Sequence, residues 1–277
     1  MSNLTPKPPS RIAIIGLGAI GRTVVDRLLE GGVMMPMPEC IALVRPQYHA
    51  DLAAIYGDRV QLASTLNQVV GFCPDIVVET AGQPAVRDHA EAILAAGLDL
   101  MLVSTGALVD NALLAHLTAT GEATGARLLI PAGAIAGLDG LGALKISGGL
   151  RVRYISTKPP TAWLGTPAET MIDLAAITVP TTFFRGSAPE AASLFPRNAN
   201  LAATIALAGA GFEHTVVELV ADPAASGNCG RFEAEANAGK LSVELAGPSM
   251  AGNAKTSVVT AYSILNALAN AGRTIII

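Results

Sequence analysis

Three glycines follow the first apolar run of the chain at the spacing Gly-x-Gly-x-x-Gly. The run covers residues 11–15, and the segment Gly-Leu-Gly-Ala-Ile-Gly comes directly after it. Between a strand and a helix, this spacing is the fingerprint of a dinucleotide-binding turn. The first glycine permits the tight turn, the second lets a pyrophosphate approach the backbone, and the third allows close helix–strand packing. We therefore predict dinucleotide contacts from Gly16, Gly18, Ala19, Ile20 and Gly21.

The end of the second predicted strand, at residues 40–44, indicates which dinucleotide is used. An acidic residue at this position binds the ribose 2′-hydroxyl of NAD, whereas an arginine accommodates the 2′-phosphate of NADP. Here the strand is followed by Arg45 and Pro46, with no acid. A solvated surface arginine is the alternative. The sequence favours NADP or dual use, and it leaves NAD open.

Two polar loops follow later predicted strands. They are Glu-Thr-Ala-Gly at 79–82 and Ser-Thr-Gly-Ala at 104–107. Ligands of open α/β sheets bind at the carboxyl ends of the strands, so Ala81, Gly82 and Ser104 are candidate cofactor contacts. Ser, Thr and Gly are equally typical of ordinary turns.

The elements that must position these residues alternate between strands and helices from residue 11 onward. This alternation is typical of a parallel sheet with crossover helices. We expect strands at 11–15, 40–44, 75–78, 100–103 and 127–130, with helices at 20–30, 89–96 and 112–120.

The pattern changes after residue 133. We expect strands at 152–157, 176–179, 215–220, 230–237 and 240–245, with helices at 200–210 and 256–271. The predicted fold is α/β, a doubly wound Rossmann parallel sheet with a second α+β domain that carries an open mixed sheet. Residues 1–134 and 252–277 would form the dinucleotide-binding domain, and residues 135–251 the substrate and dimerisation domain.

Composition excludes several function classes. The chain has 277 residues, 51% of them hydrophobic, and a net charge of −4 with only 18 Lys and Arg. No basic cluster exists to neutralise phosphates, which argues against a nucleic-acid partner. No apolar block approaches the roughly 20 residues of a membrane span. The three cysteines suggest neither a disulfide framework nor a metal site. We expect a soluble, cytoplasmic protein.

Several segments together resemble the L-aspartate dehydrogenases in order and spacing, over nearly the whole chain from residue 11. They are Gly-Leu-Gly-Ala-Ile-Gly (16–21), Pro-Ala-Gly-Ala-Ile-Ala-Gly-Leu-Asp (131–139), Thr-Lys-Pro-Pro (157–160), Phe-Pro-Arg-Asn-Ala-Asn (195–200), Ala-Asp-Pro (221–223) and Asn-Ala-Lys-Thr-Ser (253–257). The resemblance implies a homodimeric NAD(P)-dependent enzyme that interconverts aspartate with iminosuccinate, or with oxaloacetate plus ammonia. In several organisms the iminosuccinate feeds NAD biosynthesis.

Carried over residue by residue, the resemblance implies cofactor contacts from Ala134 and Asn200. An asparagine before an apolar helix is also a common N-cap, so Asn200 could serve either purpose or both. Lys158 and Arg197 are the cations nearest these segments and could hold substrate carboxylates. A surface salt bridge is the alternative for each. Asn228 is a further candidate substrate contact.

One departure from the family pattern bears on the chemistry. Where the family has Asn-x-His, with the histidine as catalytic acid/base, this chain has Asn228-Cys229-Gly230. A glycine has no side chain to carry a proton, and a missing general acid/base costs about 10²–10⁴-fold in rate. Hydride transfer needs mainly positioning, so reduction of a ready-made imine could survive. Neither Cys229 nor the four histidines is a convincing substitute.

Two classes of function therefore stand. The first is an aspartate dehydrogenase-like enzyme acting on an amino or imino acid. It would be weakened, redirected to another imine, or assisted by a water or a substrate group as proton carrier. The second is a non-catalytic NAD(P)-binding sensor or scaffold, which the missing histidine favours and the retained family segments disfavour.

Overall fold

The computed structural model describes residues 8–250 and 253–275 and divides into two compact units. The first unit comprises residues up to Pro131 together with those from Ala261 onward, and the second runs from Ala132 to Thr260. The expected roles of the two domains, substrate binding and dimerisation included, stay predictions.

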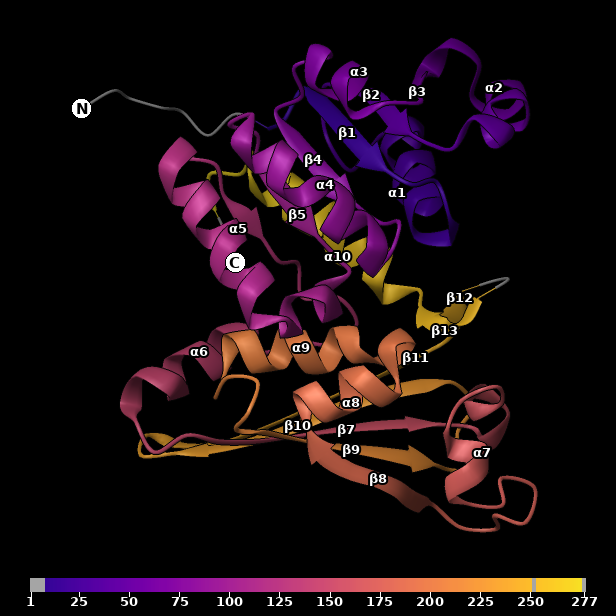
Figure 1. The fold of residues 1–277 in the computed structure, drawn as a ribbon, viewed down its shortest axis with the longest axis vertical. Coiled ribbons are helices and arrows are strands. Elements are labelled where there is room, and N and C mark those ends of the chain that lie inside the picture. Colours follow the sequence, from indigo (N-terminus) through magenta and orange to yellow (C-terminus); the bar gives the residue numbers. More distant parts are fainter. Residues whose placement is uncertain (1–7, 251–252, 276–277) are drawn as a thin grey trace. The chain divides into compact units, whose positions relative to one another are not determined.

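The first unit is built on a six-stranded, entirely parallel sheet with the order β3-β2-β1-β4-β5-β6. Strand β1 at its centre is an apolar run buried from Ile12 to Ile15, as a strand covered on both faces requires. Helices α4 and α5 pack together on one face, and α10 lies beside α1, where Arg27 donates to Tyr262 (Figure 1). The predicted Rossmann class is confirmed.

The elements of this unit have the following bounds. The strands are β1 (Arg11–Ile15), β2 (Glu39–Leu43), β3 (Val60–Ala63), β4 (Ile76–Glu79), β5 (Leu100–Leu102) and β6 (Leu128–Leu129). The helices are α1 (Ala19–Glu30), α2 (His49–Tyr56), α3 (Leu66–Gly71), α4 (Gln83–Ala95), α5 (Asn111–Thr124) and α10 (Val259–Asn270), with 3-10 turns at Pro46–Tyr48, Gly57–Arg59 and Thr105–Val109.

The second unit carries a five-stranded mixed sheet in the order β11-β10-β7-β9-β8. Strands β7 and β9 are parallel, and the other neighbours are antiparallel. Helices α6, α8 and α9 pack on one face of this sheet (Figure 1). In β7 the residues from Val152 to Lys158 alternate between the helix-covered face and the more open one. The open mixed sheet of the prediction is confirmed.

The elements of the second unit have these bounds. The strands are β7 (Arg151–Lys158), β8 (Thr181–Ser187), β9 (Thr215–Ala221), β10 (Asn228–Ala236), β11 (Gly239–Gly247), β12 (Ser249–Met250) and β13 (Asn253–Ser257). The helices are α6 (Leu138–Ser147), α7 (Ala168–Met171), α8 (Ala188–Leu194) and α9 (Ala199–Ala208), with 3-10 turns at Pro160–Trp163 and Pro196–Asn198.

The strand expected at residues 176–179 is wrong. Asp173 organises a turn there, because its carboxylate accepts the Ala175 N–H at 3.0 Å and its carbonyl accepts the Ala176 N–H. Pro180 has no N–H to donate to a sheet, and the strand β8 begins just after it. Strands β3, β8, β12 and β13 were not expected from the sequence.

Candidate functional site

A cleft of about 850 Å³ lies in the first unit at the carboxyl ends of β1, β2 and β4. Chain order reverses around β1, since β2 and β3 lie on one side of it and β4 to β6 on the other. Ligands of doubly wound folds bind at this switch point. The lining residues are Ile15, Gly16, Leu17, Gly18, Arg22, Leu43, Val44, Arg45, Pro46, Tyr48, Leu52, Ser64, Thr65, Leu66, Thr80, Ala81, Pro84, Ala85, Asp88 and His89.

The glycine-rich turn has the geometry that a dinucleotide requires. Gly16 adopts a φ of +88°, and a Cβ atom there would lie 2.7 Å from Ala81 Cβ. A Cβ on Gly21 would overlap the Gly16 carbonyl oxygen. Nothing lies within 4 Å of the Cβ position of Gly18, so the backbone there is open to a ligand. The residues present therefore fit a bound pyrophosphate.

The helix that starts at this turn supports anion binding. Helix α1 begins at Ala19, continues through Ile20, and has no acidic residue in its first turn. Its N-terminal N–H groups and dipole therefore face the cleft with no acidic side chain in the same turn.

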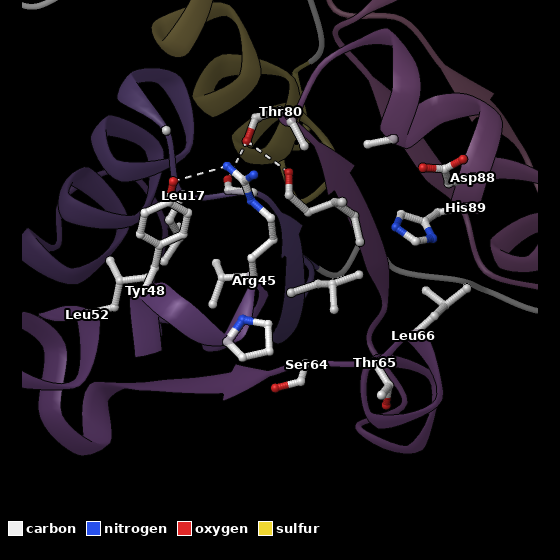
Figure 2. Close-up of a pocket in the computed structure, with 18 of the residues that line it drawn as sticks. Leu17, Arg45, Tyr48, Leu52, Ser64, Thr65, Leu66, Thr80, Asp88 and His89 are labelled. Atoms are coloured by element: carbon white, nitrogen blue, oxygen red, sulfur yellow. Dashed lines mark hydrogen bonds between the residues drawn. The ribbon is translucent and has the colours of Figure 1, made fainter. Parts of the chain in front are cut away.

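Arg45 lines the same cleft just after β2. Its guanidinium lies 5.1 Å from the centre of the Tyr48 ring and donates to the Tyr48 hydroxyl at 3.1 Å, as Figure 2 shows. The hydroxyl residues Ser64 and Thr65 line the cleft as well. They were missed from the sequence because β3, the strand before them, was missed. His89, one of the four histidines of the chain, is also a lining residue.

The loops after β4 and β5 are joined by a buried carboxylate. Glu79 is 2% exposed and accepts hydrogen bonds from the N–H groups of Ala81 and Gly82, each at 2.7 Å. It also accepts the N–H and the hydroxyl of Ser104, each at 3.0 Å. Burial raises the pKa of this carboxyl, while the four hydrogen bonds oppose that rise. The expected cofactor contact Ser104 thus has both of its donors on Glu79.

Lys158 stands at the end of β7 in the second unit and is only 6% exposed. Its Nζ lies 2.5 Å from the Asn198 side-chain oxygen and 5.2 Å from the centre of the Trp163 ring. The surface position considered for this side chain from the sequence is therefore wrong. The Asn198 side-chain nitrogen is buried and has no hydrogen-bond partner among the described residues. An ammonium and an amide donor together suit a carboxylate.

Gly230 lies in β10 opposite Ser156 of β7. A Cβ atom at Gly230 would lie 3.5 Å from Leu201 Cδ1 and 3.6 Å from both the Ala134 carbonyl oxygen and Tyr154 Cε2. These are ordinary contacts, and the backbone of Gly230 is not in the positive-φ region. Neither space nor backbone conformation requires glycine there.

Ala134 and Asn228 lie near these groups within the second unit. Ala134 is buried, and its carbonyl faces the Cβ position of Gly230. Asn228 precedes Cys229, whose strand partner is Thr157, so Asn228 comes to the same sheet end as Lys158.

Asn200 is not the N-cap that we considered. Helix α9 starts at Ala199 with Asn198 at the N-cap position, which places Asn200 inside the first turn. The side chain of Asn198 does not cap the helix either, and its oxygen accepts from Lys158 instead. Asn198 itself was missed from the sequence, because only the packing of α9 against β7 brings it to Lys158. The side chains of Arg197 and of residues 253–255 lie outside the described part of the chain.

Among the described residues, no histidine is one of the nearest neighbours of the Gly230 Cβ position. His214 is exposed in the turn before β9, and His116 pairs with Glu91 at 2.9 Å in the first unit. His49 lies 3.2 Å from the Ser64 hydroxyl. Burial raises the pKa of the Cys229 thiol, which disfavours its thiolate.

Comparisons with known proteins agree with this architecture. Residues 139–271 match the family model described as aspartate dehydrogenase, C-terminal, and residues 16–131 match the NAD-binding domain of homoserine dehydrogenase. Among described residues, no helix is long and apolar enough to cross a membrane.

Full-length relatives cover almost all of the chain. It is 44% identical to L-aspartate dehydrogenase 2 of Bordetella pertussis, over 92% of this chain and 94% of the relative. It is 41% identical to L-aspartate dehydrogenase of Acinetobacter baylyi, over 94% and 97%. The crystal structure of aspartate dehydrogenase from Thermotoga maritima matches with a TM-score of 0.75 and 29% identity, over 97% and 99%. This chain therefore belongs to the L-aspartate dehydrogenase family of NAD(P)-dependent oxidoreductases.

Proposed function

We propose that this protein interconverts L-aspartate with iminosuccinate, or with oxaloacetate plus ammonia, using NAD(P). The observation that carries the proposal is full-length identity of 41–44% to proteins named L-aspartate dehydrogenase. The buried cation and amide donor at Lys158 and Asn198 support it, because a dicarboxylic substrate needs such donors.

The cofactor residues are proposals as well. Gly16, Gly18 and Ala19 at the glycine-rich turn would hold the pyrophosphate, and Arg45 with Ser64 would face the adenosine ribose. When bound, the cofactor supplies or accepts the hydride at the substrate Cα. An arginine in place of an acid after β2 supports use of NADP alongside NAD.

The substrate residues act by binding and orientation. Lys158 would hold a substrate carboxylate through its ammonium, and the Asn198 side-chain nitrogen would donate a second hydrogen bond. Asn228 comes to the same sheet end and would orient the amino or imino group. Ala134 and Asn200 are proposed, from the family resemblance, to contact the cofactor.

The proton step is where this chain differs from the family pattern. Reducing the imine adds a hydride to Cα and one proton to nitrogen, and condensing oxaloacetate with ammonia also moves protons. Gly230 has no side chain for either transfer. We propose that a bound water or a substrate group carries the proton, so that a preformed imine reacts faster than oxaloacetate plus ammonia.

The direct test measures oxidation of NADH and NADPH with oxaloacetate and ammonium. A reaction without ammonium controls for simple keto reduction, and pyruvate with ammonium tests the need for a second carboxylate. Turnover that requires both ammonium and oxaloacetate supports the proposal. Cofactor binding without turnover of any imine would instead support the non-catalytic sensor, which the absence of an acid/base at Gly230 favours.

A homodimer in the cytoplasm is a further proposal, drawn from the family resemblance. Light scattering coupled to size-exclusion chromatography would measure the oligomer, and a monomer at working concentration would contradict it.

A further inference from the structure

Glu79 is a buried carboxylate that hydride transfer itself does not use. It ends β4, is 2% exposed, and no ion pair among the described residues includes it. Burying an unpaired charge is costly unless hydrogen bonds compensate it. The compensation here consists of four donors, three of them backbone N–H groups.

The donors require two acceptor oxygens. Oε1 accepts from Ala81 N, Gly82 N and the Ser104 hydroxyl, while Oε2 accepts from Ser104 N. Both oxygens of a carboxylate accept hydrogen bonds. A glutamine would replace one of them with an NH₂ donor, which would face the N–H or O–H groups that donate to that oxygen. The arrangement therefore selects a glutamate over its isosteric amide.

The four bonds connect two loops, those after β4 and β5, and a separate bond from Thr80 joins the first of them to the glycine-rich turn of the dinucleotide cleft. Ala81 lines the cleft, and Ser104 begins the segment after β5. Between Glu79 and Ala81, the Thr80 hydroxyl donates to the Gly16 carbonyl at 2.7 Å and so joins the β4 loop to the glycine-rich turn. Gly16 has no room for a Cβ because Ala81 packs against it. A shift of the Ala81 backbone would consequently move the turn that holds the pyrophosphate.

We propose that Glu79 is a positioning residue for NAD(P), whose carboxylate ties the loops after β4 and β5 into the shape that the cofactor needs. This inference rests on the assignment of the cleft to NAD(P). It adds a residue that touches neither substrate nor cofactor and acts through the backbone of residues 81, 82 and 104.

The test compares Glu79→Gln with the parent by titrating NADPH and NADH without substrate and following cofactor fluorescence. The glutamine loses one hydrogen bond to a charged acceptor and places its NH₂ group against that bond's donor, which should weaken cofactor binding about 10–100-fold. At saturating cofactor, kcat should stay within about 3-fold, since no reacting group changes. Glu122→Gln, an exposed position on α5, is the matched control and should leave the dissociation constant unchanged.

If Glu79 only stabilised the fold, its replacement would lower the melting temperature without changing cofactor affinity. A core variant elsewhere in the same unit shows this behaviour for comparison. Leu117→Ala removes a buried side chain of α5 away from the cleft and should lower the melting temperature without changing cofactor affinity. If Glu79→Gln also binds NADPH within about 2-fold of the parent, the proposal is wrong. Should Glu79→Gln fail to fold, Ser104→Ala removes only the hydroxyl bond and should still weaken binding about 3–10-fold. An unchanged dissociation constant in that variant would overturn the proposal.

The binding measurement is independent of the proposed reaction. A parent protein that binds NADPH but does not reduce the imine of oxaloacetate would refute the aspartate reaction and leave the Glu79 experiment intact. Conversely, the parent could turn over oxaloacetate and ammonium while Glu79→Gln binds NADPH with the same dissociation constant as the parent. That result would refute only the positioning role of Glu79.

Discussion

Replacing Gly230 with histidine is expected to accelerate the reaction of oxaloacetate and ammonium. The variant would place an imidazole at the position where the family pattern has its acid/base. A general acid/base contributes about 10²–10⁴-fold, and each tenfold corresponds to about 1.36 kcal/mol of activation free energy. The gain is thus about 2.7–5.4 kcal/mol if the imidazole reaches the substrate.

The structure sets where in this range the gain should fall. A Cβ at Gly230 has its nearest neighbours at 3.5–3.6 Å, so the side chain can start without displacing backbone. By contrast, a Cβ at Gly137 would lie 2.8 Å from Val243 Cγ2 at a φ of +71°. Leu201 Cδ1 lies 3.5 Å from that Cβ position, so an imidazole extending toward it would require Leu201 to change its rotamer. We therefore expect the lower end, about 10²-fold.

The assay is the initial rate of NADH and NADPH oxidation by the parent, Gly230→His and Gly230→Ala. The alanine variant is the matched control, because it makes the same backbone change without an imidazole. It should be as slow as the parent and equally or slightly more stable, since glycine within a strand is unfavourable. The histidine variant should also acquire a pH dependence of kcat near about 6.5, the ordinary pKa of an imidazole.

Three results would refute this reasoning. A parent as fast as the histidine variant would show that no side chain at residue 230 is needed. Equal gains in the alanine and histidine variants would trace the effect to the backbone. If all three proteins bind cofactor but stay inert, the substrate is another imine.

Three further perturbations follow from the described geometry. Arg45→Ala should raise KM for NADPH about tenfold or more and leave KM for NADH within about 2-fold, measured by steady-state kinetics with each cofactor, because only NADPH carries a 2′-phosphate. Lys158→Met should raise KM for oxaloacetate about 10–100-fold, which corresponds to the loss of one charged hydrogen bond. The NADPH dissociation constant, measured by fluorescence, should not change. Equal KM values for the parent and the variant would show that Lys158 does not bind the substrate. Glu233 accepts from Arg153 at 2.5 Å, and this bond lowers the pKa of the Glu233 carboxyl. Its stabilisation should hold above the unfolded pKa of about 4.3 and disappear as pH falls through the lower folded value. The melting-temperature gap between the parent and Glu233→Gln should therefore close in acid, and a gap that widens there would contradict the assignment.

The sequence by itself determined those features of this protein that depend on residues close together in the chain. The glycine spacing at residues 16–21 dictates a turn, because positive φ at Gly16 and crowding at Gly21 exclude side chains wherever that turn forms. The apolar run of β1 and the alternation along β7 likewise follow from burial on two faces and on one face. These features predicted the fold class.

Tertiary structure decided what depends on pairing between distant segments. The run at residues 176–179 contains strand-forming side chains, yet the turn at Asp173 and the missing N–H of Pro180 move the strand to β8. Asn198 becomes a partner of Lys158 only because α9 packs on β7, 40 residues away in sequence. The same holds for Glu79, whose role depends on Ser104, 25 residues further along the chain. Hydrogen bonds across such separations have no periodic signature in the sequence, because each depends on the register of two elements rather than on the residues within one.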